Sequence, residues 1–269
     1  MTRRIRRPRL SSRNTKAARV WAFVLLAALA AVAAGCGGSL KEQQSGVADY
    51  EKGRAAFDRS DWYDAIADLK AYVEQYPGTE KTDDALYYLG EAYFRNKDYA
   101  LASGQFDRLI RDFPQSPLQP DALFELARCD DLSSHPAPLD QTETLRAIER
   151  YRQFLDTYPE HAKAAEARTR LGALRERLAE KRFRNGRLYA KLHHDAAAIF
   201  YLEGVLNEYG DSRWAGDAAL VLAEIYLRQG KRQEAIATLR RVSQDLASAE
   251  VRRRAQERLR SLGDAGVTP

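Results

Sequence analysis

Apolar residues recur every three and four positions from about residue 47 to residue 263, and no stretch alternates apolar and polar side chains as a half-buried strand would. This pattern predicts helices almost throughout. Two stretches share it position by position, Tyr50 to Pro77 and Tyr87 to Pro114, displaced by 37 residues. The recurring residues are Gly53, Ala65, Leu69, Val73, Tyr76 and Pro77, matched by Gly90, Ala102, Phe106, Ile110, Phe113 and Pro114.

Three further copies follow, which makes about five helical hairpins. The third includes Leu123, Phe124, Ala127, Ala147, Tyr151, Phe154, Tyr158 and Pro159, the fourth Phe183, Gly186, Tyr189, Ala198, Leu202, Leu206 and Tyr209, and the fifth Ala223, Tyr226, Ala235, Ile236 and Leu239. The third copy carries eight extra residues between its helices, in the proline-containing stretch Asp131 to Leu139, which predicts a loop there.

The repeated residue types have a physical explanation. A helical hairpin cannot bury its apolar face alone, so neighbouring hairpins stack into a solenoid with a shared core. Gly or Ala at positions 53, 90, 127, 186 and 223, facing Ala at 65, 102, 147, 198 and 235, is expected to let the two helices of each hairpin approach closely. The aromatic-proline pairs are expected to end hairpins, because proline cannot continue a helical hydrogen-bond ladder.

Fourteen residues are inserted between the third and fourth copies. At about 100° per residue they add nearly four full turns and keep the apolar face in phase, so we expect one long helix over Ala164 to Leu192. Leu171, Leu174 and Leu178 would lie on its inner face, and the pairs Glu166/Arg170 and Glu180/Arg184 on its outer face. We therefore expect a three-repeat module at 47–160, a two-repeat module with the long helix at 161–263, and a tail at 264–269.

The amino-terminal stretch has the pattern of an export signal. Eight basic residues precede the fifteen-residue apolar run Val20 to Ala34, and small residues lead into Cys36. The run is shorter than the about 20 residues that a membrane-spanning helix needs. We expect residues 1–35 to be removed as a lipoprotein signal and 36–46 to form a flexible tether. Without residues 1–35 the chain has 35 basic and 38 acidic residues, so its precursor charge of +5 does not indicate a nucleic-acid partner.

The repeats resemble the tetratricopeptide repeat, with the second copy, Leu86 through Pro114, at the family's signature spacings. Five such hairpins behind a lipoprotein signal, together with the stretch Arg177 to Tyr209, resemble the BamD family. The resemblance implies an all-α tetratricopeptide solenoid of about five hairpins with a long helix between repeats three and four. It also implies palmitate-type acylation of Cys36 and attachment to the periplasmic face of the outer membrane. Gly37 follows Cys36 where an aspartate would retain enterobacterial lipoproteins in the inner membrane.

By the same resemblance, the expected function is that of a non-catalytic adaptor of the outer-membrane β-barrel assembly machinery. Its partners would be a BamA-like barrel protein, docked by the carboxy-terminal module, and the carboxy-terminal signals of nascent outer-membrane proteins. Three alternatives stay open: a cell-envelope scaffold linked to peptidoglycan synthesis or division, a periplasmic hydrolase, and a lipoprotein that binds an unrelated peptide. Co-purification of a BamA-type barrel protein distinguishes the first alternative from the adaptor.

A candidate peptide-binding surface follows from the repeat phase. Eight first-helix positions are not used by packing within a hairpin: Tyr50, Arg54, Phe57, Tyr87, Glu91, Phe94, Phe124 and Arg128. Aromatic walls with two guanidinium groups suit an extended peptide that ends in an aromatic residue and a carboxylate. The alternative, weighed equally, is that Tyr50, Tyr87 and Phe124 pack against the next hairpin, because aromatic residues at helical spacing usually belong to a core.

The sequence gives no positive indication of catalysis, a cofactor or a metal. The pattern His193-His194-Asp195 is expected to be a solvated turn between repeat helices, since no second cluster stands at metal-ligand spacing. No phosphate-binding loop or nucleophile elbow is present. With Cys36 acylated, Cys129 has no partner for a disulfide and is expected to be a small buried apolar residue.

Membrane attachment through Cys36 gives a direct test of the signal. The variant Cys36→Ser should appear in the soluble periplasmic fraction, because the acylated thiol is lost, whereas Cys129→Ser should stay with the membranes. Flotation in a sucrose gradient measures both. A Cys36→Ser variant that still floats with the membranes has another anchor and contradicts the lipoprotein interpretation.

Overall fold

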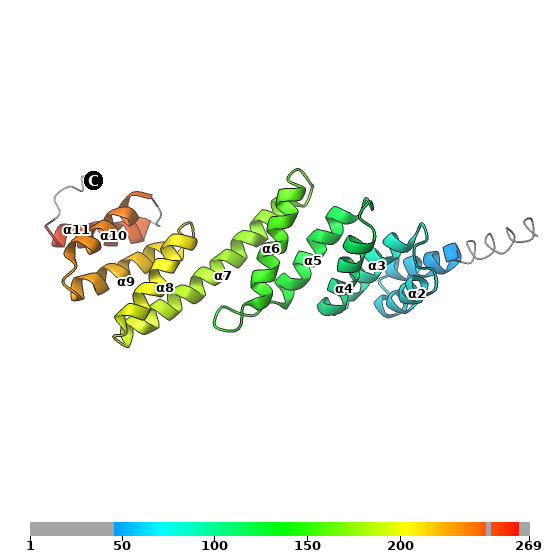
Figure 1. The fold of residues 1–269 in the computed structure, drawn as a ribbon, viewed down its shortest axis with the longest axis horizontal. Helices are drawn as coiled ribbons and strands as arrows, with labels where there is room; N and C mark the ends of the chain where they lie inside the picture. Colours follow the sequence, from blue (N-terminus) through cyan, green and yellow to red (C-terminus); the bar gives the residue numbers. More distant parts are fainter. Residues whose placement is uncertain (1–45, 246–248, 264–269) are drawn as a thin grey trace, which may run out of the picture. The chain divides into compact units, whose positions relative to one another are not determined.

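The computed structural model describes residues 46–245 and 249–263, and every regular element in these ranges is a helix. After a first helix at 46–58 come α2 (Trp62–Gln75), α3 (Thr82–Arg95), α4 (Tyr99–Asp112), α5 (Gln119–Ser133), α6 (Thr142–Thr157), α7 (Ala164–Lys191), α8 (Asp195–Glu208), α9 (Trp214–Arg228), α10 (Arg232–Asp245) and α11 (Ala249–Ser261) (Figure 1). The predicted all-α repeat fold is confirmed. The chain forms two compact units, up to Ala85 and from Leu86 onward, which are described separately.

Three hairpins close where a glycine of the first helix meets a large residue of the second. A methyl group added at the glycines would lie 2.8 Å from Leu69 at Gly53, 2.7 Å from Phe106 at Gly90 and 2.7 Å from Leu202 at Gly186. The expected facing alanines are buried, but they are not the nearest neighbours. The larger side chain four residues after each alanine lies over the glycine, namely Leu69, Phe106 or Leu202. The absence of a Cβ on the glycine makes room for this core residue.

The hairpin turns repeat one backbone motif. Ser60, Lys97, His193 and Gly230 all adopt positive φ angles, between 58° and 75°. The residue after each donates its N–H to a carbonyl five residues earlier, at 2.8–3.0 Å, as in a Schellman helix end. His193 therefore occupies the helix-ending position that glycine occupies in the last repeat. This geometry accounts for His193 as part of a turn.

Hairpins end as the aromatic-proline pairs predict. The N–H groups of Tyr76, Phe113 and Tyr158 make the last helical hydrogen bonds, at 2.8–3.0 Å, and a proline follows each. Tyr209 ends α8 in the same way although Gly210 follows it, with a hydrogen bond of 3.0 Å to the Val205 carbonyl. The aromatic residue therefore marks the hairpin end even where the proline is replaced.

The insertion in the third repeat forms a loop that begins later than predicted. Helix α5 continues to Ser133, so the loop covers 134–141 rather than 131–139. Gln141, only 5% exposed, organises this loop. Its Nε2 donates to the carbonyl oxygens of Pro136 and Asp140, at 2.9 and 3.0 Å.

The long helix is confirmed as α7, which spans 28 residues. Leu174 and Leu178 are buried and Leu171 is partly buried. The predicted outer pairs are present, with 2.8 Å between Arg170 and Glu166 and 2.6 Å between Arg184 and Glu180.

One core cluster runs from α5 and α6 into α7. It holds Phe124, Tyr151, Phe154, Leu174 and Leu178, on both sides of the predicted module boundary at residue 160. Packing is therefore continuous across that boundary.

The contact at Gly90 can be tested by adding a single methyl group. Gly90→Ala should lower the free energy of unfolding by about 1–3 kcal/mol, because the added Cβ overlaps the fully buried Phe106 ring. Gly104→Ala is the matched control, since a methyl group there meets nothing within 4 Å and should stabilise α4 by about 0.5–1 kcal/mol. Urea unfolding measures both. Equal stability of the two variants would contradict the close approach of α3 and α4.

Candidate functional site

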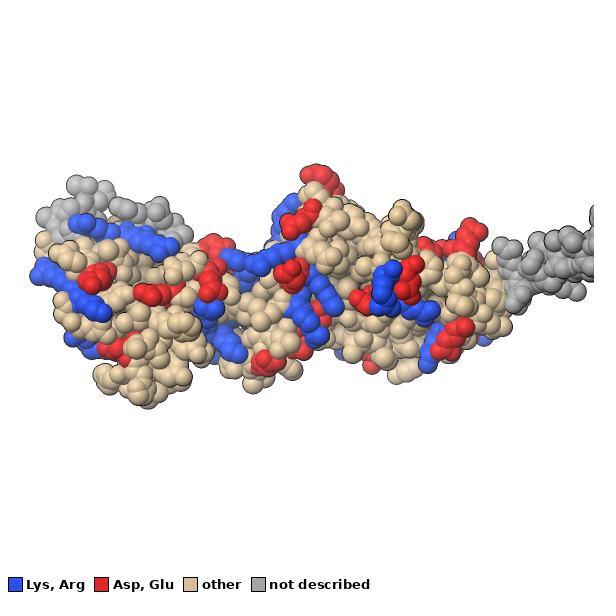
Figure 2. All heavy atoms as spheres, viewed as in Figure 1, with Lys and Arg blue, Asp and Glu red and all other residues tan. Residues whose placement is uncertain are grey.

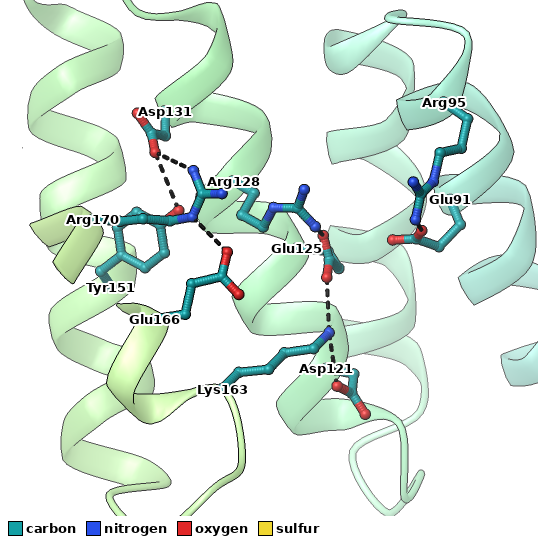
Figure 3. Close-up of polar contacts among 10 residues, drawn as sticks. All are labelled: Glu91, Arg95, Asp121, Glu125, Arg128, Asp131, Tyr151, Lys163, Glu166 and Arg170. Carbon is teal, nitrogen blue, oxygen red and sulfur yellow. Dashed lines mark hydrogen bonds and ion pairs between the residues drawn. The ribbon is translucent and has the colours of Figure 1, made fainter. Parts of the chain in front are cut away.

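A buried ionic cluster lies on the first helices of the repeats, with Glu125 of α5 at its centre (Figure 3). Glu125 is 2% exposed. Its carboxylate accepts hydrogen bonds from Arg128 Nη1 at 2.6 Å and from Lys163 Nζ at 2.8 Å, and Lys163 also contacts Asp121 at 2.9 Å. A carboxylate removed from water is stabilised only by such close opposite charges. The cluster therefore fixes the start of α7 against α5.

The same two cations lie over aromatic rings. The guanidinium carbon of Arg128 is 4.5 Å from the centroid of the Phe94 ring, and Lys163 Nζ is 4.9 Å from that of Phe124. These distances are within the range of cation–π attraction. Arg128 thus links α3 and α5 through its contacts with Phe94 and Glu125.

Glu91 of α3 is incompletely paired, as is Arg128 Nε, which is buried without a hydrogen-bond partner in the described part of the chain. Glu91 is 7% exposed, and Arg95 Nη2 donates to Glu91 Oε2 at 3.5 Å. Glu91 Oε1 is buried and has no hydrogen-bond partner in the described part of the chain. Figure 3 shows the Glu91 carboxylate pointing toward Arg128 and Glu125. Burial, with the nearby negative charge of Glu125, raises the pKa of Glu91.

A second cluster continues along α7. Arg170 donates from Nη1 to Asp131 at 3.1 Å and from Nε to Glu166 at 2.8 Å. The Tyr151 hydroxyl donates to Asp131 Oδ2 at 3.4 Å, and burial raises the pKa of this hydroxyl. These contacts hold α5, α6 and α7 together where the core passes from one hairpin to the next.

The structure corrects the packing expected of several candidate peptide-binding residues. Tyr50, Phe94 and Phe124 are not left over by packing, since they are 5%, 7% and 0% exposed. Tyr50 packs on Tyr72 in the first unit, with ring centroids 5.7 Å apart. Phe124 packs on Tyr151 and Phe154 in the second unit, with ring centroids 5.9 and 5.5 Å apart. Each of these rings contacts an aromatic ring of the second helix of its own hairpin, whereas the alternative expected Tyr50, Tyr87 and Phe124 to pack against the next hairpin.

The other candidates lie in different settings. Within the first unit, Arg54 forms an ion pair with Asp58 and lies 5.5 Å from the Phe57 ring centroid, and both Arg54 and Phe57 are partly exposed. Within the second unit, Tyr87 packs edge-on against Phe106, with centroids 5.8 Å apart, and burial raises the pKa of its hydroxyl. Glu91 and Arg128 belong to the ionic region described above. Peptide binding by all eight residues stays a prediction.

The sequence patterns did not identify Glu125, Lys163 or the surface around Phe200 as parts of a site. Glu125 stands inside the apolar run Ala122–Ala127, and a charge in such a run is the signal that was available. Lys163 lies just before α7 and carries no comparable signal.

Helices α6, α7 and α8 line a cavity of about 390 Å³ in the second unit, which we call the Phe200 cleft. Its wall includes Leu145, Leu178, Phe200, Tyr201 and Tyr209. Phe200 is 67% exposed and Leu145 is 56% exposed. Lys181 and Arg182 border the apolar part, and Arg182 contacts Glu208 at 2.8 Å. Large apolar side chains gathered at an exposed cleft favour contact with another macromolecule.

The described residues hold no group of three or more potential metal ligands. Cys129 is buried and free, and burial raises the pKa of its thiol, so it is unreactive as a nucleophile. No helix in the described ranges is long and apolar enough to cross a membrane. Cys36 lies outside the described residues.

A family model named YfiO, with the description "Outer membrane lipoprotein", matches residues 42–241. The chain belongs to this family. Similar proteins include the Outer membrane protein assembly factor BamD of Caulobacter vibrioides, 29% identical over 213 residues, which covers 77% of this chain and 70% of that protein. The BamD of Haemophilus influenzae is 25% identical over 217 residues, which covers 76% of this chain and 83% of that protein. The predicted BamD resemblance of this YfiO-family member is confirmed.

Solved structures similar to this YfiO-family member are more distant. A crystal structure of MamA protein has a TM-score of 0.40 and 15% identity, and it covers 84% of this chain and 100% of that one. A tetratricopeptide repeat protein from Parabacteroides merdae has a TM-score of 0.38 and 16% identity, and it covers 82% of this chain and 88% of that one. The assignment of the repeat fold is therefore based on the helical hairpins of this chain and not on these similarities.

The raised pKa of Glu91 predicts a dependence of stability on pH. The unfolded chain loses this proton near the ordinary value of 4.5, and the folded chain loses it at higher pH. Between the two values the folded state binds more protons, so the free energy of unfolding contributed by Glu91 falls as pH rises. Glu91→Gln should therefore be more stable than the parent at pH 7, by about 1 kcal/mol or more, because the neutral amide places no charge in this buried position.

Urea unfolding from about pH 4 to about pH 8 measures this difference. Glu149→Gln is the control, since it makes the same chemical change at an exposed position. A Glu91→Gln variant less stable than the parent at neutral pH would mean that the ionised carboxylate stabilises the fold.

Proposed function

We propose that the protein is a non-catalytic adaptor of the outer-membrane β-barrel assembly machinery. The family match over residues 42–241 carries this proposal, together with relatives named as assembly factors. The exposed apolar cleft and the repeat architecture suit a protein that binds other proteins. The adaptor would be held at the periplasmic face of the outer membrane by lipid on Cys36.

The Phe200 cleft is the surface we assign to a BamA-like barrel protein. An exposed ring beside a second large apolar side chain resembles the central anchors of protein interfaces, where a few aromatic residues provide most of the binding energy. Lys181 and Arg182 at the border would set orientation through charge. The periplasmic domains of the barrel protein would pack on Phe200 and Leu145.

Truncation of Phe200 tests this assignment. Phe200→Ala should weaken binding of the purified periplasmic domains of the barrel protein by about 2 kcal/mol, roughly thirtyfold in Kd, without a change in the thermal melt. Tyr63→Ala is the control, since Tyr63 is 79% exposed on α2 and also loses an aromatic ring. Biolayer interferometry measures both. Equal affinities of Phe200→Ala and the parent would exclude the cleft as the docking site.

Nascent outer-membrane proteins are the second partner in this proposal, through their carboxy-terminal signals. Arg54 and Phe57 are the candidates best suited to contact such a peptide, because both are partly exposed on the helix at 46–58. Phe94 and Phe124 would support the first helices from within the core. Arg128 would position Phe94 through its contacts with that ring and with Glu125.

A labelled barrel-signal peptide separates these roles. Arg54→Ala should lose a charge-assisted hydrogen bond of about 1.5–3 kcal/mol at low salt, and the loss should shrink as salt rises. Phe57→Ala should weaken binding with little salt dependence. Phe124→Ala should instead lower the melting temperature, because it opens a cavity in the core. Unchanged peptide affinity in both Arg54→Ala and Phe57→Ala would place the client site elsewhere.

A further inference from the structure

A second groove runs along a different face of α7, and neither partner in the proposed function uses it. Two cavities, of about 460 and 380 Å³, lie along this helix and share Arg184. Six of their nine lining residues on α7 follow a spacing of three and four, the spacing of one helix face: Ala173, Arg177, Glu180, Arg184, Arg187 and Lys191. We call this surface the α7 groove. Pro136 and Pro138 of the inserted loop border one end.

The other end of the α7 groove has an aromatic floor. The rings of Phe183 and Trp214 stack, with centroids 5.3 Å apart and an angle of 28° between planes. Leu188 beside them is 53% exposed. Trp214 Nε1 is buried without a hydrogen-bond partner in the described part of the chain. The floor therefore offers apolar contact area.

The charges of the α7 groove are unbalanced. Arg184 is paired with Glu180 at 2.6 Å, and Arg213 with Glu176 at 3.6 Å. By contrast, Arg187 and Lys191 are exposed and form no ion pair within the described residues, and Arg177 donates to the Ser134 hydroxyl rather than to a carboxylate. Figure 2 shows basic side chains, interspersed with acidic ones, over α6 and α7. The groove thus carries uncompensated positive charge next to apolar surface.

We propose that the α7 groove binds an acidic, extended segment of a partner protein that also carries apolar side chains. Carboxylates of the segment would contact Arg177, Arg187 and Lys191, and an apolar side chain would pack on Leu188 and the stacked rings. Ala173 and Lys191 are about 27 Å apart along the helix axis, which an extended segment of about eight residues spans. Long cations at helical spacing suit successive carboxylates of such a segment.

The test uses the full chain in mild detergent and a fluorescein-labelled peptide of about eight residues that alternates glutamate with phenylalanine. The same peptide with glutamine in place of glutamate is the ligand control. The paired substitution Arg187→Glu and Lys191→Glu should weaken anisotropy-detected binding by about tenfold or more at low salt, and this effect should fade at high salt. Leu188→Ser should weaken binding by about threefold at any salt concentration.

A matched charge control lies on α11. The pair Arg258→Glu and Arg260→Glu makes the same charge change at exposed positions near another helix end, and it should leave the affinity unchanged. Equal losses in the two paired variants, or equal binding of the glutamine peptide, would overturn the proposal in favour of general charge attraction. A final measurement tests binding of the protein to vesicles of phosphatidylglycerol. Binding to these vesicles through Arg187 and Lys191, without binding to the acidic peptide, would overturn it in favour of a membrane surface.

Discussion

The close approach of two helices at a small residue is the constraint on which this structure depends. At Gly53, Gly90 and Gly186 a leucine or phenylalanine of the second helix lies where a Cβ would stand. This contact fixes which face of the first helix turns inward. The remaining faces of that helix then meet the next hairpin or solvent. The ionic cluster around Glu125 and the α7 groove lie on such faces of α5 and α7.

Buried charge in the second unit follows from the same arrangement. First helices lie next to one another, so Glu91 and Glu125 come close enough for their charges to interact, and the cations Arg128 and Lys163 lie among them. Arg128 serves at once as a partner of Glu125 and as a cation over Phe94. The rings of Phe94 and Phe124 are 7% and 0% exposed and have almost no surface left for a ligand. Client recognition is therefore better placed on partly exposed residues such as Arg54 than on the most buried aromatic rings.

The repeats, the long helix and the hairpin ends could be predicted from the sequence, because glycine, alanine and aromatic-proline pairs recur at fixed spacing. The burial of Tyr50, Phe94 and Phe124 could not be settled, since periodicity identifies an apolar face without showing whether another hairpin covers it. Phe200 is the converse case: it stands among apolar residues of α8 and yet is exposed. Glu125 was missed because its partner Lys163 lies 38 residues away in the chain.

Purification of the full chain from its native membranes in a mild detergent, with identification of the bound proteins by mass spectrometry, tests the adaptor function most directly. The account predicts an outer-membrane barrel protein with periplasmic domains as the main companion, recovered in amounts similar to the chain itself. Recovery of peptidoglycan-synthesis or division proteins without any barrel protein would contradict it.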